Sequence, residues 1–265
     1  MNRGGLIALG LAAGGAGAAA VIAGAAAQEQ AAAPAVVSQG PELARPAAPA
    51  LAIPAPRDLA DGPELTRWAH VRRAVVARAK PRSGARAVAR VARLTPEGSV
   101  TALPVTARRG GGGGMLWMRV TLPALPNGTS GWVPRRALGA FEISRHRLVV
   151  DLDRQRLTLL HRGRAVLRAP VGVGQRRWPT PRGQFIVRNR LERYSSPQYG
   201  PVAFGTSARS PTLTDWPAGG FIGIHGTDRP ELLPGRVSHG CVRLRNADIL
   251  RLARLMPVGT PVEFR

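Results

Sequence analysis

Short apolar runs separated by turn-forming residues make up most of the chain after residue 68. This pattern is typical of β-strands, whose side chains alternate between two faces and whose ends are marked by Gly, Pro, Asn and Asp. In the first part of this region we expect strands at 73–79, 87–94, 100–106, 116–122 and 131–134. Strands this short and closely spaced favour a small β-barrel over residues 68–140.

The same pattern continues from residue 146 to the end of the chain. Segments 147–152 and 156–161 flank a turn at 153–155, which predicts a β-hairpin. Further strands are expected at 165–171, at 184–188, around Ala203, at 221–225 and at 261–264. The sequence therefore predicts a second β domain over residues 146–265, and a protein that is mainly β.

One segment of the second domain has a different period, because the apolar residues of 247–256 recur as they do in an α-helix. We expect Asn246 to cap the start of this helix and Pro257 to end it. The face expected to be buried carries the apolar residues Ile249, Leu250, Leu252, Ala253 and Met256.

The N-terminal region has the composition of a targeting segment followed by a linker. Residues 1–27 combine a positively charged start, an apolar stretch at 4–27 and a final Ala-Ala-Ala, which are the parts of a secretory signal peptide. The apolar stretch is also long enough to cross a bilayer, so an uncut N-terminal membrane anchor is the alternative. Residues 28–62 are rich in Ala and Pro and predict an extended linker. We therefore expect an exported protein.

The candidate chemistry gathers around Cys241, which is the only cysteine in the chain. A lone cysteine forms no internal disulfide, and in an exported protein its position in a Gly-flanked loop favours a reactive thiol. A thiol nucleophile needs a base, and His225 and His239 are both close in sequence. The spacing alone does not choose between these two histidines.

A metal site is the rival interpretation of His225, His239 and Cys241, since all three side chains can ligate a soft metal. The His-x-Cys spacing is not one of the usual zinc spacings. We therefore expect neither a metal nor another cofactor.

Three motifs resemble the L,D-transpeptidases with a YkuD-type catalytic domain. These are IHGT at 224–227, SHGC at 238–241 followed by Val-Arg-Leu, and PTPRGQF at 179–185. The resemblance covers residues 146–264 and implies a β-sandwich or barrel-like catalytic domain with one short helix. Separately, the run from Met115 to Leu138, which includes GWV, resembles the end of a bacterial SH3-like domain. We therefore expect an SH3-like barrel at 68–140.

The YkuD resemblance assigns roles to the catalytic residues. It implies that Cys241 is the nucleophile and that His225 is the base, with the Gly226 carbonyl holding the imidazole in the useful tautomer. His239 would then shape the loop, and the backbone amides of His239, Gly240 and Cys241 would be available as an oxyanion hole.

Two further side chains are expected to contact the substrate or hold the loop. Arg243 follows the nucleophile by two positions, so on an extended backbone both side chains emerge on the same face. A cation there would favour the thiolate and could bind a substrate carboxylate. Ser238 is expected to hold the loop through local hydrogen bonds, and we place Ser238, Gly226 and Arg243 at the substrate-binding side of the site.

By resemblance, the enzyme would act on peptidoglycan. The thiolate would attack the bond before the terminal D-Ala of a tetrapeptide stem, and the amine of a neighbouring stem would take the acyl group to form a 3-3 cross-link. With water as acceptor the same site would be an L,D-carboxypeptidase, and a protein lysine is a third acceptor. A non-catalytic wall-binding protein is the alternative of another class.

The formal net charge of +23 and the pI of about 12.0 raise the question of an anionic partner. The arginines are scattered through Ala-, Gly- and Pro-rich sequence, and Lys80 is the only lysine. A compositional bias toward Arg is one interpretation of this charge, and electrostatic retention on an anionic cell wall is the other. No recognised nucleic-acid-binding motif accompanies the charge, so we expect no nucleic acid partner.

Overall fold

The computed structural model describes residues 57–58, 66–111, 114–192, 196–213 and 220–265. The predicted signal or anchor at 1–27 lies outside the described residues, and so does the predicted linker at 28–62 apart from residues 57–58. Within the described part of the chain, no helix is long and apolar enough to span a membrane. The predictions for the N-terminal region therefore stay predictions.

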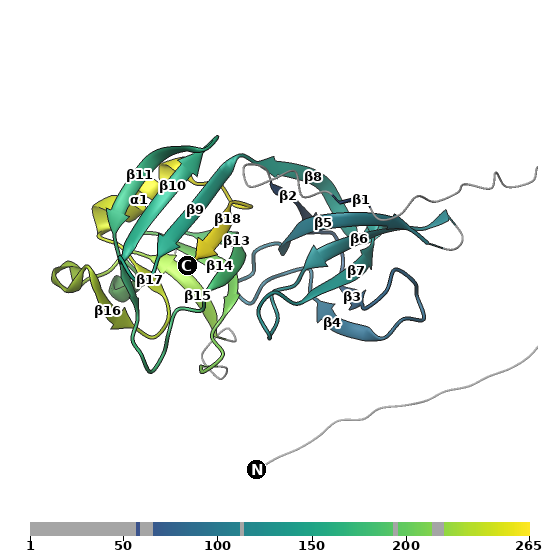
Figure 1. Cartoon of the computed structure of the whole chain (residues 1–265), viewed down its shortest axis with the longest axis horizontal. Helices are drawn as coiled ribbons and strands as arrows, with labels where there is room; N and C mark the ends of the chain where they lie inside the picture. Colours follow the sequence, from purple (N-terminus) through teal and green to yellow (C-terminus); the bar gives the residue numbers. More distant parts are fainter. Residues whose placement is uncertain (1–56, 59–65, 112–113, 193–195, 214–219) are drawn as a thin grey trace, which may run out of the picture. The chain divides into compact units, whose positions relative to one another are not determined.

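The first half of the described chain forms an eight-stranded sheet in the order β4-β3-β7-β6-β5-β2-β8, with β1 paired to β5 (Figure 1). Its core is made by apolar side chains such as Leu103, Met118, Val120 and Val133. The strands are β1 (Arg57–Asp58), β2 (Thr66–Val71), β3 (Val75–Arg78), β4 (Ala87–Val91), β5 (Ala102–Gly110), β6 (Leu116–Thr121), β7 (Ser130–Pro134) and β8 (Leu138–Ser144).

The strands predicted between residues 73 and 134 correspond to β3 to β7, whereas β2 and β8 were not predicted. These two strands pair with each other, with Trp68 opposite Glu142 and Thr66 opposite Ser144. Four consecutive residues of β8 are exposed, so the strand lacks the alternation that marks a half-buried strand. The SH3-like character of residues 68–140 stays a prediction.

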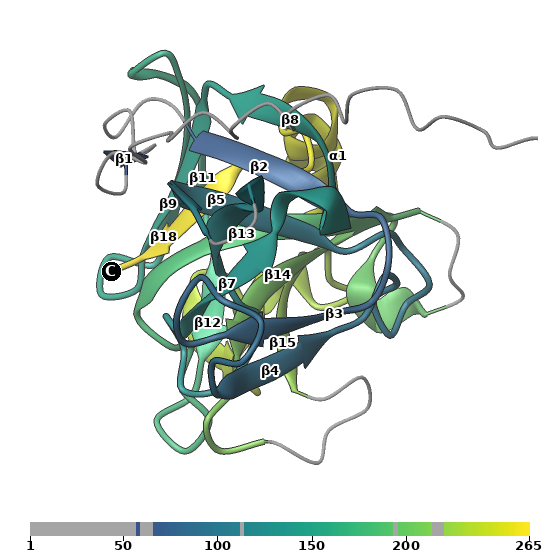
Figure 2. The same ribbon diagram turned by 90° about the vertical axis from the view of Figure 1, so that its right-hand side faces the viewer.

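The second half forms a ten-stranded sheet in the order β11-β10-β9-β18-β13-β14-β15-β17-β12-β16. Figure 2 shows β9, β18, β13 and β14 following one another across this sheet. Its large apolar core includes Leu148, Leu157, Phe204 and Phe264. The strands are β9 (His146–Asp151), β10 (Arg156–His161), β11 (Arg164–Pro170), β12 (Gly172–Gly174), β13 (Gly183–Leu191), β14 (Ala203–Arg209), β15 (Phe221–His225), β16 (Gly235–Ser238), β17 (Val242–Arg243) and β18 (Pro261–Phe264).

The mainly β fold class is thus confirmed, and so is the hairpin, in which β9 and β10 pair in antiparallel register. β12, β16 and β17 were not predicted. They are two to four residues long, and β17 pairs in parallel with β15, so no local alternation reveals them. β16 and β17 are the strands on either side of Cys241. Single 3-10 turns occur at Arg135–Ala137, Pro197–Tyr199 and Pro230–Leu232.

The predicted helix is present as α1 (Asn246–Leu255), but its start differs from the prediction. The N-cap residue is Arg245, and Asn246 is the first helical residue. The Asn246 side chain instead accepts a hydrogen bond from the Thr227 N–H at 3.0 Å. The predicted apolar face is wrong at Leu250, which is 40% exposed.

The described residues belong to one compact unit, and the two sheets share apolar contacts. Trp68 of β2 and Ala102 of β5 form a buried cluster with Ile186 of β13. Gly259 lies against the Trp68 ring with φ of +85°, and a Cβ built there would lie 2.1 Å from ring atoms. Only glycine allows this close approach.

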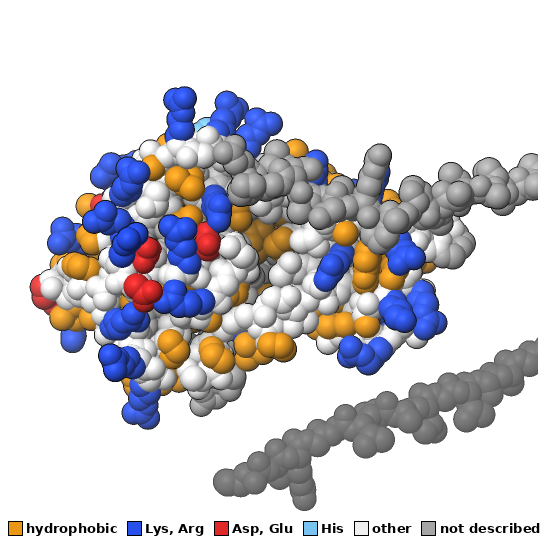
Figure 3. Space-filling model, in the orientation of Figure 1, with side chains coloured by type: hydrophobic (Ala, Val, Ile, Leu, Met, Phe, Trp, Pro, Cys, Tyr) orange, Lys and Arg blue, Asp and Glu red, His pale blue; other side chains and the backbone are white. Residues whose placement is uncertain are grey.

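Arginine side chains are spread over the face drawn in Figure 3, with a few acidic side chains between them. Among the described residues, Asp153 pairs with Arg182 at 2.8 Å and with Arg236 at 3.4 Å. These exposed pairs neutralise part of the positive charge but add little stability, because solvent screens them.

Candidate active site

Cys241 lies in a tight loop between β16 and β17, and Ser238 ties this loop together. Ser238 is 1% exposed, and its hydroxyl donates to the Cys241 carbonyl oxygen at 2.6 Å. The same hydroxyl accepts the Gly240 N–H at 3.1 Å. Gly240 has a φ of +119°, a backbone conformation that favours glycine. The local hydrogen bonds predicted for Ser238 are therefore present.

The amide of Gly240 was one of three expected to be available as an oxyanion hole. Because this N–H donates to the Ser238 hydroxyl, it is engaged within the loop in this structure. An oxyanion hole that used Gly240 would require this hydrogen bond to break.

Thr180, within the PTPRGQF segment, supports the same loop from the other side. It is 6% exposed, its hydroxyl donates to the Gly240 carbonyl at 2.7 Å, and it accepts the Gly174 N–H at 3.0 Å. The PTPRGQF motif therefore contributes a side chain that braces the cysteine loop, a role that the sequence alone did not indicate.

His225 ends β15 and is 3% exposed. Its Nδ1 lies 2.6 Å from the Gly226 carbonyl oxygen, which is the contact that the resemblance implied. Because a carbonyl oxygen only accepts, Nδ1 carries the proton and Nε2 is left as the basic nitrogen. The ring of Tyr199 lies 4.6 Å from the His225 ring, centroid to centroid. The buried imidazole is thus held in one orientation.

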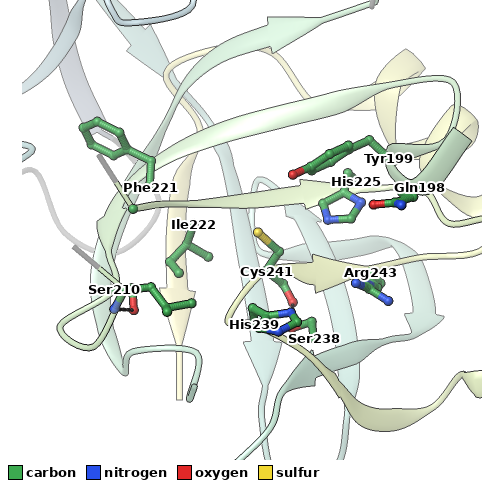
Figure 4. Close-up of a pocket in the computed structure, with 12 residues that line it drawn as sticks. Gln198, Tyr199, Ser210, Phe221, Ile222, His225, Ser238, His239, Cys241 and Arg243 are labelled. Carbon is green, nitrogen blue, oxygen red and sulfur yellow. Dashed lines mark hydrogen bonds between the residues drawn. The ribbon is translucent and has the colours of Figure 1, made fainter. Parts of the chain in front are cut away.

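Gly223 is close to both the thiol and the imidazole. A Cβ built at Gly223 would lie 3.7 Å from Cys241 Sγ and 3.6 Å from His225 Cδ2, so both groups face the same point of β15. The Gly223 N–H also donates to Cys241 Sγ at 3.3 Å. Figure 4 shows the sulfur directed toward the strand that carries Ile222 and His225.

The electrostatic environment keeps both groups neutral at neutral pH. Burial raises the pKa of the Cys241 thiol, and the opposing effects of the Gly223 N–H and the Arg243 charge are smaller. Burial, with a smaller contribution from the Arg243 charge, lowers the pKa of His225 to about 4 against the opposing effect of the hydrogen bond to Gly226. The expected preference for a thiolate is therefore not realised in this structure, where a thiol faces a neutral imidazole.

Arg243 lies opposite His225 in the parallel pairing of β15 and β17, and it lines the same pocket as Cys241. This agrees with the expectation that the two side chains emerge on one face. The Arg243 Nε is buried and has no hydrogen-bond partner among the described residues. Such an atom is rare in folded proteins, so it marks a position where a ligand oxygen could bind.

The pocket combines predicted residues with others that the sequence did not indicate. Its lining includes Cys241, His225, His239, Ser238 and Arg243 from the prediction (Figure 4). The remaining lining residues come from segments without a recognisable motif, and they are Gln198, Tyr199, Ser210, Leu213, Gly220, Phe221 and Ile222.

Gly226 and Gly240 were predicted as site residues, but neither is among the described residues that line this pocket. Gly226 lies behind His225, where a Cβ would come within 2.3 Å of the Asn246 side chain. Its contribution is therefore the carbonyl that orients His225, and the prediction of a substrate contact at Gly226 finds no support in this placement.

His239, the other candidate base, differs from His225 in its surroundings. It is exposed, and its ring lies 4.1 Å from the Trp178 ring. Its position within the loop between β16 and β17 fits the loop-shaping role that the resemblance implied. Among the described residues, no three His, Cys, Asp or Glu side chains cluster in a way that could hold a metal ion.

These features define a β-sheet protein with a cysteine and a buried histidine facing one pocket, and the comparisons with known proteins agree with the motifs. Residues 145–264 match the YkuD family model, the L,D-transpeptidase catalytic domain. The segment is 36% identical over 119 residues to YkuD of Bacillus licheniformis, covering 45% of this chain and 65% of that protein. The predicted YkuD-type catalytic domain is thereby confirmed for this segment.

Other relatives match the same part of the chain. YbiS of Escherichia coli strain K12 is 35% identical over 136 residues, covering 44% of each protein. A crystal structure of an Enterococcus faecium L,D-transpeptidase mutant is 25% identical and covers 45% of this chain and 49% of that chain, with a TM-score of 0.37. YkuD and YbiS carry L,D-transpeptidase names, and this chain spans less than two thirds of the length of each.

Proposed function

We propose that this protein is an exported cysteine L,D-transpeptidase that cleaves the terminal D-Ala from a peptidoglycan tetrapeptide stem and transfers the acyl group to an amine, forming 3-3 cross-links. The observation that carries the proposal is the placement of Cys241 Sγ and the His225 ring around Gly223, within a segment that matches the YkuD domain. Peptidoglycan stem peptides are the substrate, and no cofactor takes part.

The acylation step uses the neutral pair that the site holds at rest. As Cys241 Sγ attacks the carbonyl carbon before the terminal D-Ala, the thiol proton moves to Nε2 of His225. The Gly226 carbonyl stabilises the imidazolium that forms, because it accepts the Nδ1–H at 2.6 Å. The C–N bond then breaks, the proton passes to the departing amine of D-Ala, and a thioester remains on Cys241.

The transfer step repeats the proton movements in reverse. The side-chain amine of a second stem attacks the thioester carbonyl, gives a proton to His225, and releases the Cys241 thiol as the new amide forms. A water molecule in place of the amine would make the same site an L,D-carboxypeptidase. The two outcomes differ only in the acceptor.

Arg243 is the proposed site for the substrate carboxylate. Arg243 lines the same pocket as Cys241, and its buried Nε has no partner among the described residues. A terminal D-Ala carboxylate would satisfy this donor through a charge-assisted hydrogen bond. Scattered surface arginines would add attraction to an anionic cell wall, where we place the protein, with the N-terminal segment as signal or anchor.

Product analysis tests this proposal. The purified full chain and its Cys241→Ala variant are incubated with a disaccharide-tetrapeptide, and soluble products are separated by liquid chromatography with mass spectrometry. We expect a cross-linked dimer that lacks one D-Ala, formed by the unmutated protein only. Tripeptide without dimer would identify the carboxypeptidase, and no turnover by a folded protein would support the wall-binding alternative.

A further inference from the structure

Arg188 of β13 is a buried cation, and its charge is neutralised by Glu97 from the N-terminal half of the described chain. Its side chain is 3% exposed, and its guanidinium forms two hydrogen bonds with the Glu97 carboxylate, at 2.9 Å and 2.6 Å. Glu97 lies between β4 and β5, and it also accepts from the Asn189 side chain at 3.1 Å. A guanidinium does not lose its proton, so its burial depends on this paired carboxylate.

The buried guanidinium supports the start of β15. Its carbon Cζ lies 3.8 Å from the centroid of the Phe221 ring, a cation–π contact in a water-excluded position. Its Nε donates to the Thr206 carbonyl at 2.9 Å, and the Thr206 hydroxyl donates to the Ile222 carbonyl at 2.7 Å. Arg188 therefore contacts Phe221 directly and reaches Ile222 through Thr206.

Phe221 and Ile222 both line the pocket that contains Cys241. Figure 4 shows them at the start of the strand that continues to His225. The next residue, Gly223, donates its N–H to Cys241 Sγ. The position of this strand thus sets the pocket wall next to the thiol.

We propose that Glu97 is a positioning residue for this pocket, because it holds Arg188 against Phe221 and so fixes the beginning of β15. The N-terminal sheet thereby contributes to the active site without touching the substrate. This inference rests on the proposed function for its kinetic consequence, whereas its structural consequence can be measured without any substrate.

Three variants of the full chain separate positioning from mere stabilisation. Glu97→Gln removes the carboxylate charge and keeps the shape. Glu97→Leu combined with Arg188→Met removes both charges, which usually recovers the stability lost when one partner of a buried pair is removed. The matched control is Asp153→Asn, which breaks an ion pair with Arg182 whose side chains are 68% and 56% exposed.

The substrate-independent readout is hydrogen–deuterium exchange of the backbone amides of 221–225. We expect exchange there to rise about tenfold or more in Glu97→Gln and in the double variant, because local opening of β15 becomes easier. Asp153→Asn should leave it unchanged. Unchanged exchange at 221–225 in both Glu97 variants would overturn the proposal.

The kinetic readout is the separation of KM from kcat with the tetrapeptide. In the double variant we expect KM to rise about tenfold, because displacement of a pocket wall weakens productive binding. Recovery of both the melting temperature and KM in the double variant would show that Glu97 only stabilises the fold. If the unmutated protein shows no turnover, the proposed function fails, and the exchange data still decide the positioning role.

Discussion

Acidification should destabilise the protein through His225. Burial holds the pKa of this histidine at about 4 in the folded state, against the ordinary value of 6.5. Between these two values the unfolded chain binds the proton more readily than the folded chain. The stability contributed by His225 is therefore complete above pH 6.5 and is lost as the pH falls toward 4, a loss of about 3 kcal/mol in the free energy of unfolding.

Urea unfolding at pH 7 and pH 4 measures this contribution. In His225→Asn the side-chain amide can still donate to the Gly226 carbonyl, but it does not titrate. The loss of stability between the two pH values should be smaller in this variant by about 3 kcal/mol. Burial raises the pKa of Glu97, but the hydrogen bonds and charge of Arg188 outweigh it, so the pKa is lowered overall and Glu97 adds to the loss equally in both proteins.

A histidine outside the site provides the control for this comparison. His70→Gln removes a histidine whose side chain is 41% exposed, and it should behave as the unmutated protein does. An equal pH dependence in His225→Asn and the unmutated protein would refute the reasoning, since it would mean that His225 protonates without cost in the folded state.

Three further substitutions test the geometry of the site. Gly223→Ala should fold, because the new methyl meets only ordinary contacts at 3.6 Å to 3.7 Å. The methyl would touch both the thiol and the imidazole, so it should lower kcat/KM about 100-fold. A fully active variant would contradict this placement. Thr180→Val should lower the free energy of unfolding by about 1–3 kcal/mol, because it leaves the buried Gly174 N–H and Gly240 carbonyl unpaired. An unchanged midpoint of urea unfolding would show that these two groups find other partners. Arg243→Met should raise KM about tenfold for a tetrapeptide with a free terminal carboxylate and not for its amide; equal effects on both substrates would exclude a carboxylate contact.

Local sequence patterns predicted the elements whose burial alternates along the chain. The strand at 221–225 and the strand at 261–264 were predicted with the bounds that the structure has. Strands such as β17 could not be found in this way, because two residues held by a parallel neighbour carry no period of their own. Asn246 satisfies the sequence rule for a helix cap, but its side chain accepts a hydrogen bond from the Thr227 N–H instead.

In the candidate site, too, some residues could be predicted from the sequence and others could not. The motifs at 224–227 and 238–241 identified Cys241 and His225, because the reactive groups themselves are conspicuous in sequence. The position of Phe221 in the pocket wall and its support by Glu97 could not be predicted. Glu97 and Arg188 are separated by 91 positions, and only the packing of two sheets brings them together. The neutral thiol was also not foreseen, because it follows from burial rather than from neighbouring residues.

Intact-protein mass spectrometry of the full chain during incubation with the disaccharide-tetrapeptide shows whether Cys241 carries the acyl group. We expect a transient mass increase equal to the donor minus one D-Ala, located on the peptide that contains Cys241 and missing in Cys241→Ala. An adduct at another residue, or dimer formation by Cys241→Ala, would contradict a mechanism in which this thiol carries the acyl group.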